Sequence, residues 1–328
     1  MQGSAHLCNH STYKLKLWMR ELETKHLLNL REILQGRYLS AVSAGFSGTP
    51  VILSLDRTRD YRLPEGRVKL RSDTINNYRI HYFLGEELKH IELTPTHSNY
   101  HDIQPLGSDR WLAVSARASG YYDKNAHIYS SCGELIHSFH VRDGVETIQA
   151  TETGRLWITS DCGWGTELVC LDETGQRIFK YEGESPSIHS SLHTLFCYAM
   201  NVASERDIWT YCDTAYYPGE FSLVHISNEE IRREWFPFPL QYQNAFALNK
   251  DYHALFDGDY GDYALFAGTY QNDSLFLVSL NTMGFEELIP VDESGKAIKS
   301  FRAFGRGSRL FLYTDDALSL VRLDRDNW

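Results

Sequence analysis

Four short apolar segments repeat along the chain, and this repeat constrains the fold more than any other feature of the sequence. They cover residues 168–171, 223–226, 277–280 and 320–323, and each reads Leu-Val-x-Leu or Leu-Val-x-Ile. Successive copies begin 55, 54 and 43 residues apart. Repeats of this period are typical of architectures in which each copy is one supersecondary unit that packs on its neighbours.

A second recurring strand with a large apolar centre lies upstream of these copies. It covers residues 110–114, 155–159, 207–211 and 309–313, with 253–256 as a weaker copy. The clearest unit, residues 145–183, alternates four short strands with tight turns that contain glycine. Four antiparallel strands at this spacing describe the blade of a β-propeller, whereas separate sandwiches would need about 100 residues each.

The repeat predicts an all-β, six-bladed propeller that forms a single domain over residues 12–328. The expected blades are residues 37–93, 98–141, 145–183, 195–238, 244–291 and 299–324. The last copy stops after three strands, so we expect Tyr13–Met19 to supply the fourth strand and close the ring. A short helix is possible within Glu21–Leu34, and residues 1–11 are expected to be disordered or vector-derived.

Composition narrows the class of protein. With 42% hydrophobic and 23% charged residues, the chain is neither disordered, collagen-like nor a coiled coil. A net charge of −11 disfavours nucleic acid and anionic membranes as partners and favours a basic one. We find no apolar stretch long enough to span a membrane and no secretory signal, so we expect a cytoplasmic protein. The six cysteines form no C-x-x-C pair, and reduced thiols are expected.

The loops between the second and third strands of each blade emerge on one face of a propeller, so they become neighbours. In this sequence they are rich in carboxylates and aromatic rings. The candidate partner-binding residues are Tyr121, Tyr122, Asp123, Asp161, Trp164, Asp213, Tyr216, Tyr217, Glu220, Asp257, Asp259, Tyr260 and Asp262. Asp315 and Asp316 lie in the corresponding loop of the last blade, and the first blade instead carries a basic loop between Arg57 and Arg71.

Two interpretations of these loops stay open. Exposed polar loops are common, so the carboxylates could simply be solvated while the rings fill gaps between blades. Alternatively, the rings anchor a protein partner and the carboxylates steer a basic one toward them. Residues 200–273 alone hold 12 acidic and 4 basic side chains, which concentrates the charge on few blades.

Known catalytic and metal-binding motifs are incomplete in this sequence. Residues 45–49 fail the last position of a nucleophile elbow, and residues 257–262 depart from a calcium loop. His189 and His193 have the spacing of zinc ligands but lack the glutamate of the metalloprotease motif. We therefore expect no catalytic residues, no metal and no cofactor, although carboxylates from different blades could still converge in a sugar-processing site.

Several segments resemble a widespread group of uncharacterised bacterial propeller-like proteins. The resemblance is carried by residues 99–106, 125–129, 143–144, 154–158, 198–202 and 207–209. It implies a bacterial cytoplasmic propeller and brings no established catalytic residues. Some bacterial proteins of this general kind are immunity partners of secreted toxins, which is an argument by analogy.

These observations favour a non-enzymatic protein-binding propeller. In its sharpest form, the hypothesis is an antibacterial immunity protein that binds and occludes a basic toxin domain. The alternative is a carbohydrate-binding or carbohydrate-processing propeller, because Trp164, Tyr216 and Tyr217 beside Asp213 would also suit a sugar. A scaffold that holds several partners would use the same surface with a different stoichiometry.

Overall fold

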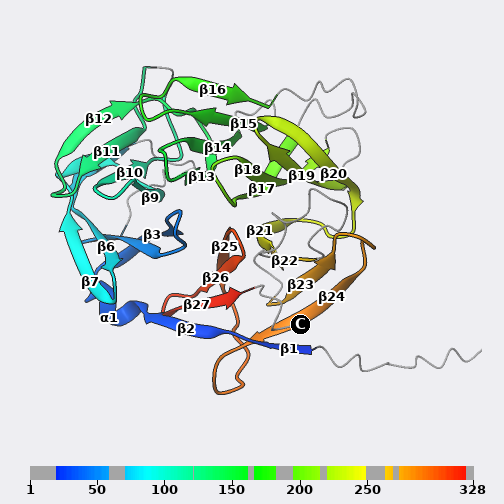
Figure 1. The fold of residues 1–328 in the computed structure, drawn as a ribbon. Coiled ribbons are helices and arrows are strands. Elements are labelled where there is room, and N and C mark those ends of the chain that lie inside the picture. Colours follow the sequence, from blue (N-terminus) through cyan, green and yellow to red (C-terminus); the bar gives the residue numbers. More distant parts are fainter. Residues whose placement is uncertain are drawn as a thin grey trace, which may run out of the picture.

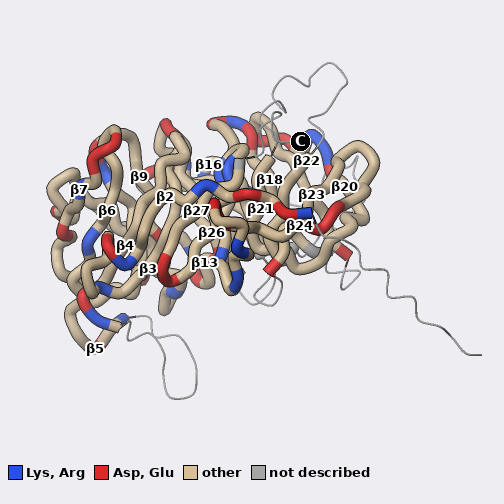
Figure 2. The backbone as a smooth tube through the Cα atoms, turned by 90° about the horizontal axis from the view of Figure 1, so that it is seen from below, with Lys and Arg blue, Asp and Glu red and all other residues tan. Residues whose placement is uncertain are grey.

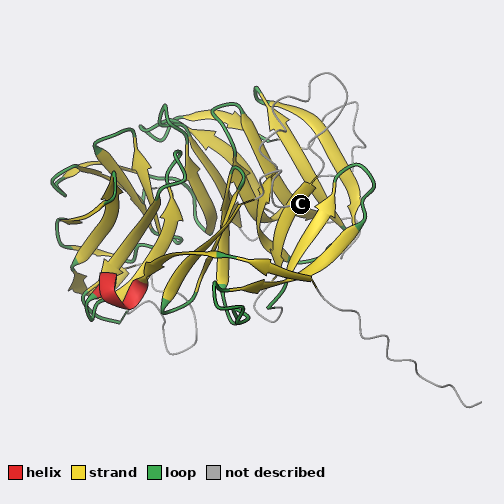
Figure 3. Cartoon of the chain, turned by 60° about the horizontal axis from the view of Figure 1, so that its bottom comes forward, coloured by secondary structure: helices red, strands yellow, loops and turns green. Residues whose placement is uncertain are grey.

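The protein is a ring of six four-stranded blades around a common axis (Figure 1). The computed structural model describes residues 20–58, 71–120, 122–161, 166–181, 195–214, 220–248, 263–268 and 273–322. The all-β, six-bladed propeller expected from the repeat is confirmed. Across these ranges the only helix is the single turn α1 (Leu30–Leu34), and no helix among them is long and apolar enough to cross a membrane (Figure 3).

The first three blades follow one another along the chain, with the first strand of each blade nearest the axis of the ring. Blade one consists of β3 (Tyr38–Ala44), β4 (Pro50–Leu55), β6 (Tyr78–Leu84) and β7 (Glu87–Glu92). Blade two consists of β9 (Asp102–Leu106), β10 (Arg110–Val114), β11 (Ala126–Ser130) and β12 (Leu135–Phe139). Blade three consists of β13 (Val145–Ala150), β14 (Leu156–Asp161), β15 (Thr166–Leu171) and β16 (Arg177–Lys180).

The remaining blades repeat this antiparallel order. Blade four consists of β17 (Leu195–Val202), β18 (Asp207–Thr214), β19 (Phe221–Ser227) and β20 (Glu230–Phe238). Blade five consists of β21 (Gln243–Leu248), β22 (Tyr263–Gly268), β23 (Leu275–Ser279) and β24 (Phe285–Val291). Blade six consists of β25 (Arg302–Arg306), β26 (Arg309–Tyr313), β27 (Ala317–Arg322) and the N-terminal β2 (Lys25–Asn29).

An N-terminal strand closes the ring, as expected, but a different segment does so. β2 pairs antiparallel with β27, and β1 (Arg20–Glu23) adds a parallel fifth strand to blade five beside β24. Leu27 and Leu28 pack against the apolar cluster between blades six and one. Tyr13–Met19 lies outside the described residues, and the outer position of blade six belongs to Lys25–Asn29 because its leucines reach that cluster.

The two faces of the disc carry different connections. Because consecutive strands run antiparallel, the links between second and third strands and between successive blades share one face, which we call the loop face. The hairpin turns between first and second strands and between third and fourth strands share the other, the turn face. A small sheet of β5 (Arg71–Asn76) and β8 (Thr96–Ser98) belongs to the loop face, where β5 lies below the disc in Figure 2.

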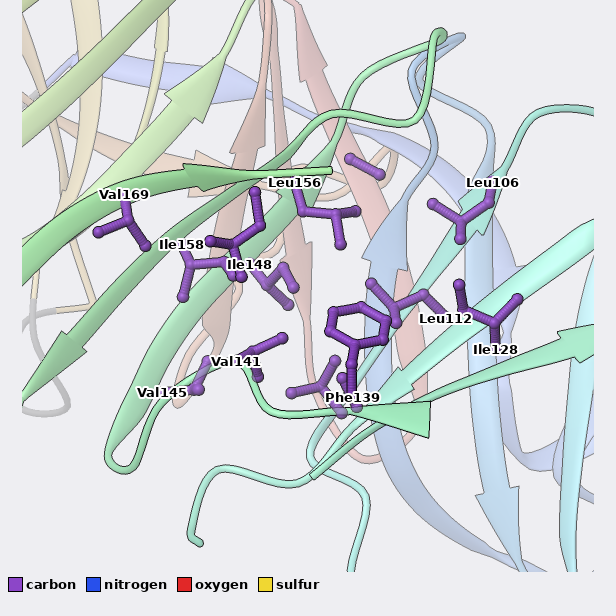
Figure 4. Packing of buried hydrophobic residues seen from close by; sticks show 14 residues of the cluster. Leu106, Leu112, Ile128, Phe139, Val141, Val145, Ile148, Leu156, Ile158 and Val169 are labelled. Carbon is purple, nitrogen blue, oxygen red and sulfur yellow. The ribbon is translucent and has the colours of Figure 1, made fainter. Parts of the chain in front are cut away.

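The apolar core is divided among the junctions between blades. Successive side chains of a strand point to opposite sides, so Leu156 and Ile158 pack toward blade two while Trp157 packs toward blade four. Figure 4 shows the cluster between blades two and three, where Leu112, Phe139 and their neighbours fill the space between the two sheets. Each blade therefore depends on both neighbours for burial, which makes the ring one cooperative unit.

Candidate functional site

Tyr122 and Asp123, in the β10–β11 loop, are the candidate residues that the structure describes in most detail. The side chain of Tyr122 is 95% exposed on the loop face. Asp123 accepts hydrogen bonds from the backbone N–H and hydroxyl of Ser119, at 2.9 and 3.1 Å. Its other carboxylate oxygen lies 2.9 Å from the guanidinium of Arg71. The loop is thus held at its base while Tyr122 points outward.

Asp123 supports the loop and offers little surface of its own. Burial alone would raise the pKa of Asp123, but the bonds from Ser119 and Arg71 outweigh it and lower the pKa below its usual value. Its side chain is only 12% exposed. The pair with Arg71 also joins the basic segment of blade one to the acidic loop of blade two, so part of the expected basic sector is used within the molecule.

The remaining candidate residues of the loop face lie partly within the described ranges. Glu220 is exposed just before β19, and Asp161 and Asp213 lie near the ends of β14 and β18. Asp315 is 95% exposed, and Asp316 forms an ion pair with Arg31 of α1. Tyr121, Trp164, Tyr216 and Tyr217 lie outside the described residues.

The candidate residues of blade five follow the first strand of their blade and precede the second. Asp257, Asp259, Tyr260 and Asp262 lie outside the described residues, between β21 and β22. Since these are the first and second strands of the blade, the strand ends that flank the segment open on the turn face. The sequence contains Ala-Leu-Phe twice, at 254–256 and 264–266, and the second copy forms the buried strand. The second strand of blade five is therefore Tyr263–Gly268, while the weaker repeat at 253–256 lies outside the described residues.

Hydrogen bonds between the inner strands, most of them from polar side chains, link successive blades around the axis of the ring. Ser43 donates to the carbonyl of Ile103, and the backbone N–H of Ala150 donates to Gln104 at 3.3 Å. The side-chain amide of Gln149 joins blade three to blade four, since it donates to the carbonyl of Met200 and accepts from the backbone N–H of Val202. The side chain of Asn201 donates to the carbonyl of Phe246 in blade five at 2.9 Å. The backbone N–H of Leu248 donates to the carbonyl of Gly307 in blade six at 3.0 Å. These bonds satisfy backbone groups that the inner edges would otherwise leave unpaired in a buried site.

Arg306 is a buried cation near the axis of the ring, and the sequence did not predict its burial. Its guanidinium donates to the side chain of Gln149, at 2.9 Å, and to the carbonyl of Ala150, so it ties blade six to blade three. Burial lowers the pKa of Arg306 to about 10. Next to it, the backbone of Gly305 approaches blade five so closely that a Cβ would lie 1.7 Å from the carbonyl oxygen of Phe246.

Three equivalent arginines connect blades on the turn face. Arg110, Arg155 and Arg309 each precede by two residues a side chain that packs toward the next blade. Arg110 binds Glu173 of blade three, Arg155 binds Glu229 of blade four, and Arg309 binds the carbonyl of Ser47 in blade one. The repeated Arg at the start of the second strand was visible in the sequence and could have predicted these contacts.

The other motifs considered in the sequence are structural wherever the structure describes them. Gly45–Thr49 is the hairpin turn between β3 and β4, with Gly48 donating to the carbonyl of Gly45 at 2.8 Å. Within the described ranges, no three His, Cys, Asp or Glu side chains gather in a way that could hold a metal. Cys132, Cys170, Cys197 and Cys212 are free thiols. His189 and His193 lie outside the described residues.

Known structures resemble this chain only distantly. A virginiamycin B lyase from Staphylococcus aureus has 13% identity and a TM-score of 0.45, and the match covers 91% of this chain and 98% of that one. An alpha-L-arabinofuranosidase from Fusarium graminearum has 9% identity and a TM-score of 0.45, covering 93% and 98%. A chain of a mitotic checkpoint complex has 7% identity and a TM-score of 0.45, covering 87% and 77%.

No protein-family model and no curated protein matches the sequence. The family is therefore not identified, and the resemblance to bacterial propeller-like proteins stays an expectation. The six-bladed fold follows from the strand pairing itself.

Proposed function

We propose that this protein is a non-enzymatic, cytoplasmic protein-binding propeller whose partner docks on the loop face. The observation that carries the proposal is the geometry of the β10–β11 loop, where a 95% exposed tyrosine stands on a base fixed by Asp123. A tyrosine side chain has only two side-chain torsion angles to order on binding, and aromatic anchors dominate the affinity of protein interfaces. In its specific form, the partner is a basic toxin domain that the propeller occludes.

The charge of the chain supports a basic partner. The net charge is −11, and Glu220 and Asp315 are exposed on the same face as Tyr122. Long-range attraction of this kind raises association rates mainly at low ionic strength.

The first test is affinity capture of the tagged protein from the cells that produce it, together with its Tyr122→Ala variant. We expect one stoichiometric basic protein with the parent chain and a loss of at least tenfold in affinity with the variant. Leu84→Ala is the matched control, because Leu84 is 67% exposed at a turn-face hairpin. Equal capture by the parent and both variants would contradict the loop-face interface.

Charge-reversal variants test the electrostatic attraction of the partner separately from the contact at Tyr122. Glu220→Arg with Asp315→Arg should slow association at low salt and flatten its salt dependence, since both carboxylates are exposed on the loop face. The control pair is Glu86→Arg with Glu134→Arg, two exposed carboxylates of turn-face hairpins. If the captured partner is a toxin, co-expression of the propeller should restore growth of cells that produce it. An absence of rescue would reject toxin neutralisation while leaving protein binding intact.

A further inference from the structure

Two cysteines lie directly opposite each other on neighbouring strands of blade four. Cys197 on β17 is paired in register with Cys212 on β18, and the two strands run antiparallel. Residues opposite each other in such a pair have Cα atoms about 4.5 or 5.5 Å apart. Disulfides join residues whose Cα atoms lie about 4.4–6.8 Å apart. The backbone therefore already holds these two residues at a separation that a disulfide can bridge.

The two side chains also point to the same side of the blade, as opposite residues of an antiparallel pair do. They belong to one apolar cluster between blades three and four, where Cys197 is 5% exposed and Cys212 is fully buried. Burial raises the pKa of Tyr181 in this cluster, and both thiols add to the effect. A single hydroxyl that is close to both thiols supports their being neighbours.

A third cysteine of the same cluster has no such neighbour. Cys170 lies on β15 of blade three, where it is opposite Trp157 on one adjacent strand and Phe179 on the other. It is buried like the pair but faces no cysteine in either register. Cys170 therefore serves as an internal comparison for any chemistry that depends on the pairing.

The strand is irregular beside Cys197. The register with β18 shifts between Cys197 and Ala199, so Tyr198 is an extra residue in β17. Such a bulge bends its strand and interrupts the local hydrogen bonds. Buried thiols react slowly, and local opening of a strand is one way to expose them. The bulge also lets the Cβ atoms approach, since opposite residues hold them about 4.5–5.5 Å apart and a disulfide needs about 3.8 Å.

We propose that Cys197 and Cys212 form a reversible disulfide when the protein meets hydrogen peroxide. The less buried thiol, Cys197, attacks the peroxide as its thiolate and becomes a sulfenic acid, and water is released. The sulfur of Cys212 then displaces hydroxide from the sulfenic sulfur, and this hydroxide leaves as water with the proton of the second thiol. Two thiols and one peroxide thus give one disulfide and two waters.

A bond at this position should be redox-sensitive and not permanent. Drawing the two strands together stores strain, and strained disulfides are reduced more readily. Asp213, a candidate residue of the loop face, directly follows Cys212 in β18, so the bond would fix the strand end that carries it. The inference does not depend on the proposed protein partner, because it needs only the two thiols and the oxidant.

The test treats the folded full chain with hydrogen peroxide, blocks the remaining thiols with N-ethylmaleimide and digests the product with trypsin without reduction. Trypsin cuts after Lys180, Arg206 and Arg232, so the two cysteines end in separate peptides, 181–206 and 207–232. We expect mass spectrometry to find these two peptides linked as the main disulfide product. Incubation with millimolar reduced glutathione before digestion should separate them.

Variants and a denatured sample serve as controls. Cys212→Ala should abolish the linked peptides and Cys170→Ala should leave them unchanged, after melting temperatures show that both variants fold. Cys132→Ala removes an exposed thiol and with it links between molecules. The chain oxidised in guanidinium should give mixed pairings. In the parent chain, no link between Cys197 and Cys212, a main product that joins another cysteine, or a bond that glutathione leaves intact would overturn the proposal.

Discussion

The junction between blades two and three and the junction between blades four and five solve the same packing problem with different side chains. The first is aliphatic, with Phe139 as its one aromatic ring among the described residues, and Arg110 with Glu173 bridges it at the surface. The second is filled by stacked rings, including Trp209 and Trp235, whose centroids lie 5.2 Å apart. The propeller therefore requires a filled volume between blades and does not require a particular residue there.

The position equivalent to Arg110 shows how the second junction differs. In blade four it is occupied by Asp207, which binds His225 at 3.2 Å. The ring of His225 stacks on Trp209 with centroids 4.3 Å apart. A surface bridge between blades is thus replaced by a buried polar contact within one blade, which holds the aromatic stack in register.

Truncation of equivalent core residues should show the difference between the two junctions most clearly. Trp209→Ala removes the central ring of a stack and should lower the free energy of unfolding by about 4–5 kcal/mol, whereas Leu112→Ala should lower it by about 3 kcal/mol. Urea denaturation followed by circular dichroism measures both. Equal losses, or a larger loss for Leu112→Ala, would show that the aromatic junction is not the more demanding one.

Asp102 gives blade two a distinctive pH dependence. Burial raises its pKa from 3.8 to about 7, although Gln104 and the Ile103 N–H donate to its carboxylate. Because the folded state favours the protonated acid, stability falls as the pH rises from about 4 to about 7. Asp102→Asn mimics the protonated form and should add about 2 kcal/mol at pH 8, a value reduced for the partial exposure of this inner-strand residue. It should add nothing at pH 4, so a constant difference across this range would contradict the account.

Asp207 should titrate in the opposite sense. Burial would raise its pKa, but hydrogen bonds from His225, Ser204 and Ser227 outweigh it and lower the pKa from 3.8 to about 2. The stability that it contributes is present above pH 4 and is lost as the pH falls toward 2. Asp207→Asn should therefore lower the free energy of unfolding by about 2 kcal/mol at pH 7 and converge with the parent near pH 2. If the free energies of unfolding of the parent and the variant differ by a constant amount across this pH range, the charge of Asp207 does not contribute to stability.

The ion pair between Arg110 and Glu173 should contribute least to the free energy of unfolding. A double-mutant cycle of Arg110→Ala and Glu173→Ala should give a coupling of about 0.5–1 kcal/mol, because both side chains are partly exposed and water screens them. The coupling should shrink in 1 M salt. A coupling above about 2 kcal/mol would place the main strength of this junction in its ion pair and not in its aliphatic core.

The architecture was readable from the sequence because strand pattern and turn chemistry are local. The clearest unit, expected over residues 145–183, is blade three, whose strands run from Val145 to Lys180. The closing strand was less readable, since Tyr13–Met19 alternates apolar and basic residues convincingly. The observed choice depends on distant contacts, such as the bond from the Leu30 N–H to the carbonyl of Asp316 at 2.8 Å.

The candidate site was less predictable, because its contacts join segments that lie far apart in the sequence. Gly305-Arg306-Gly307 reads as a surface turn, yet Arg306 ends an inner strand and is buried by blades far away in the sequence. Tyr122 could be assigned to the correct face, because the loop order within a blade fixes it. Its exposure, and the burial of its neighbour Asp123, depend on Arg71 from another blade and could not be inferred from spacing.

The central claim is that the loop face around Tyr122 binds a protein, and site-specific photo-crosslinking tests it most directly. A photoreactive phenylalanine analogue replaces Tyr122 in one sample and Leu84, on the turn face, in another, and both are irradiated in the producing cells. The account predicts one dominant crosslinked protein from position 122 and none from position 84. No crosslink at position 122, or the same products from both positions, would contradict it.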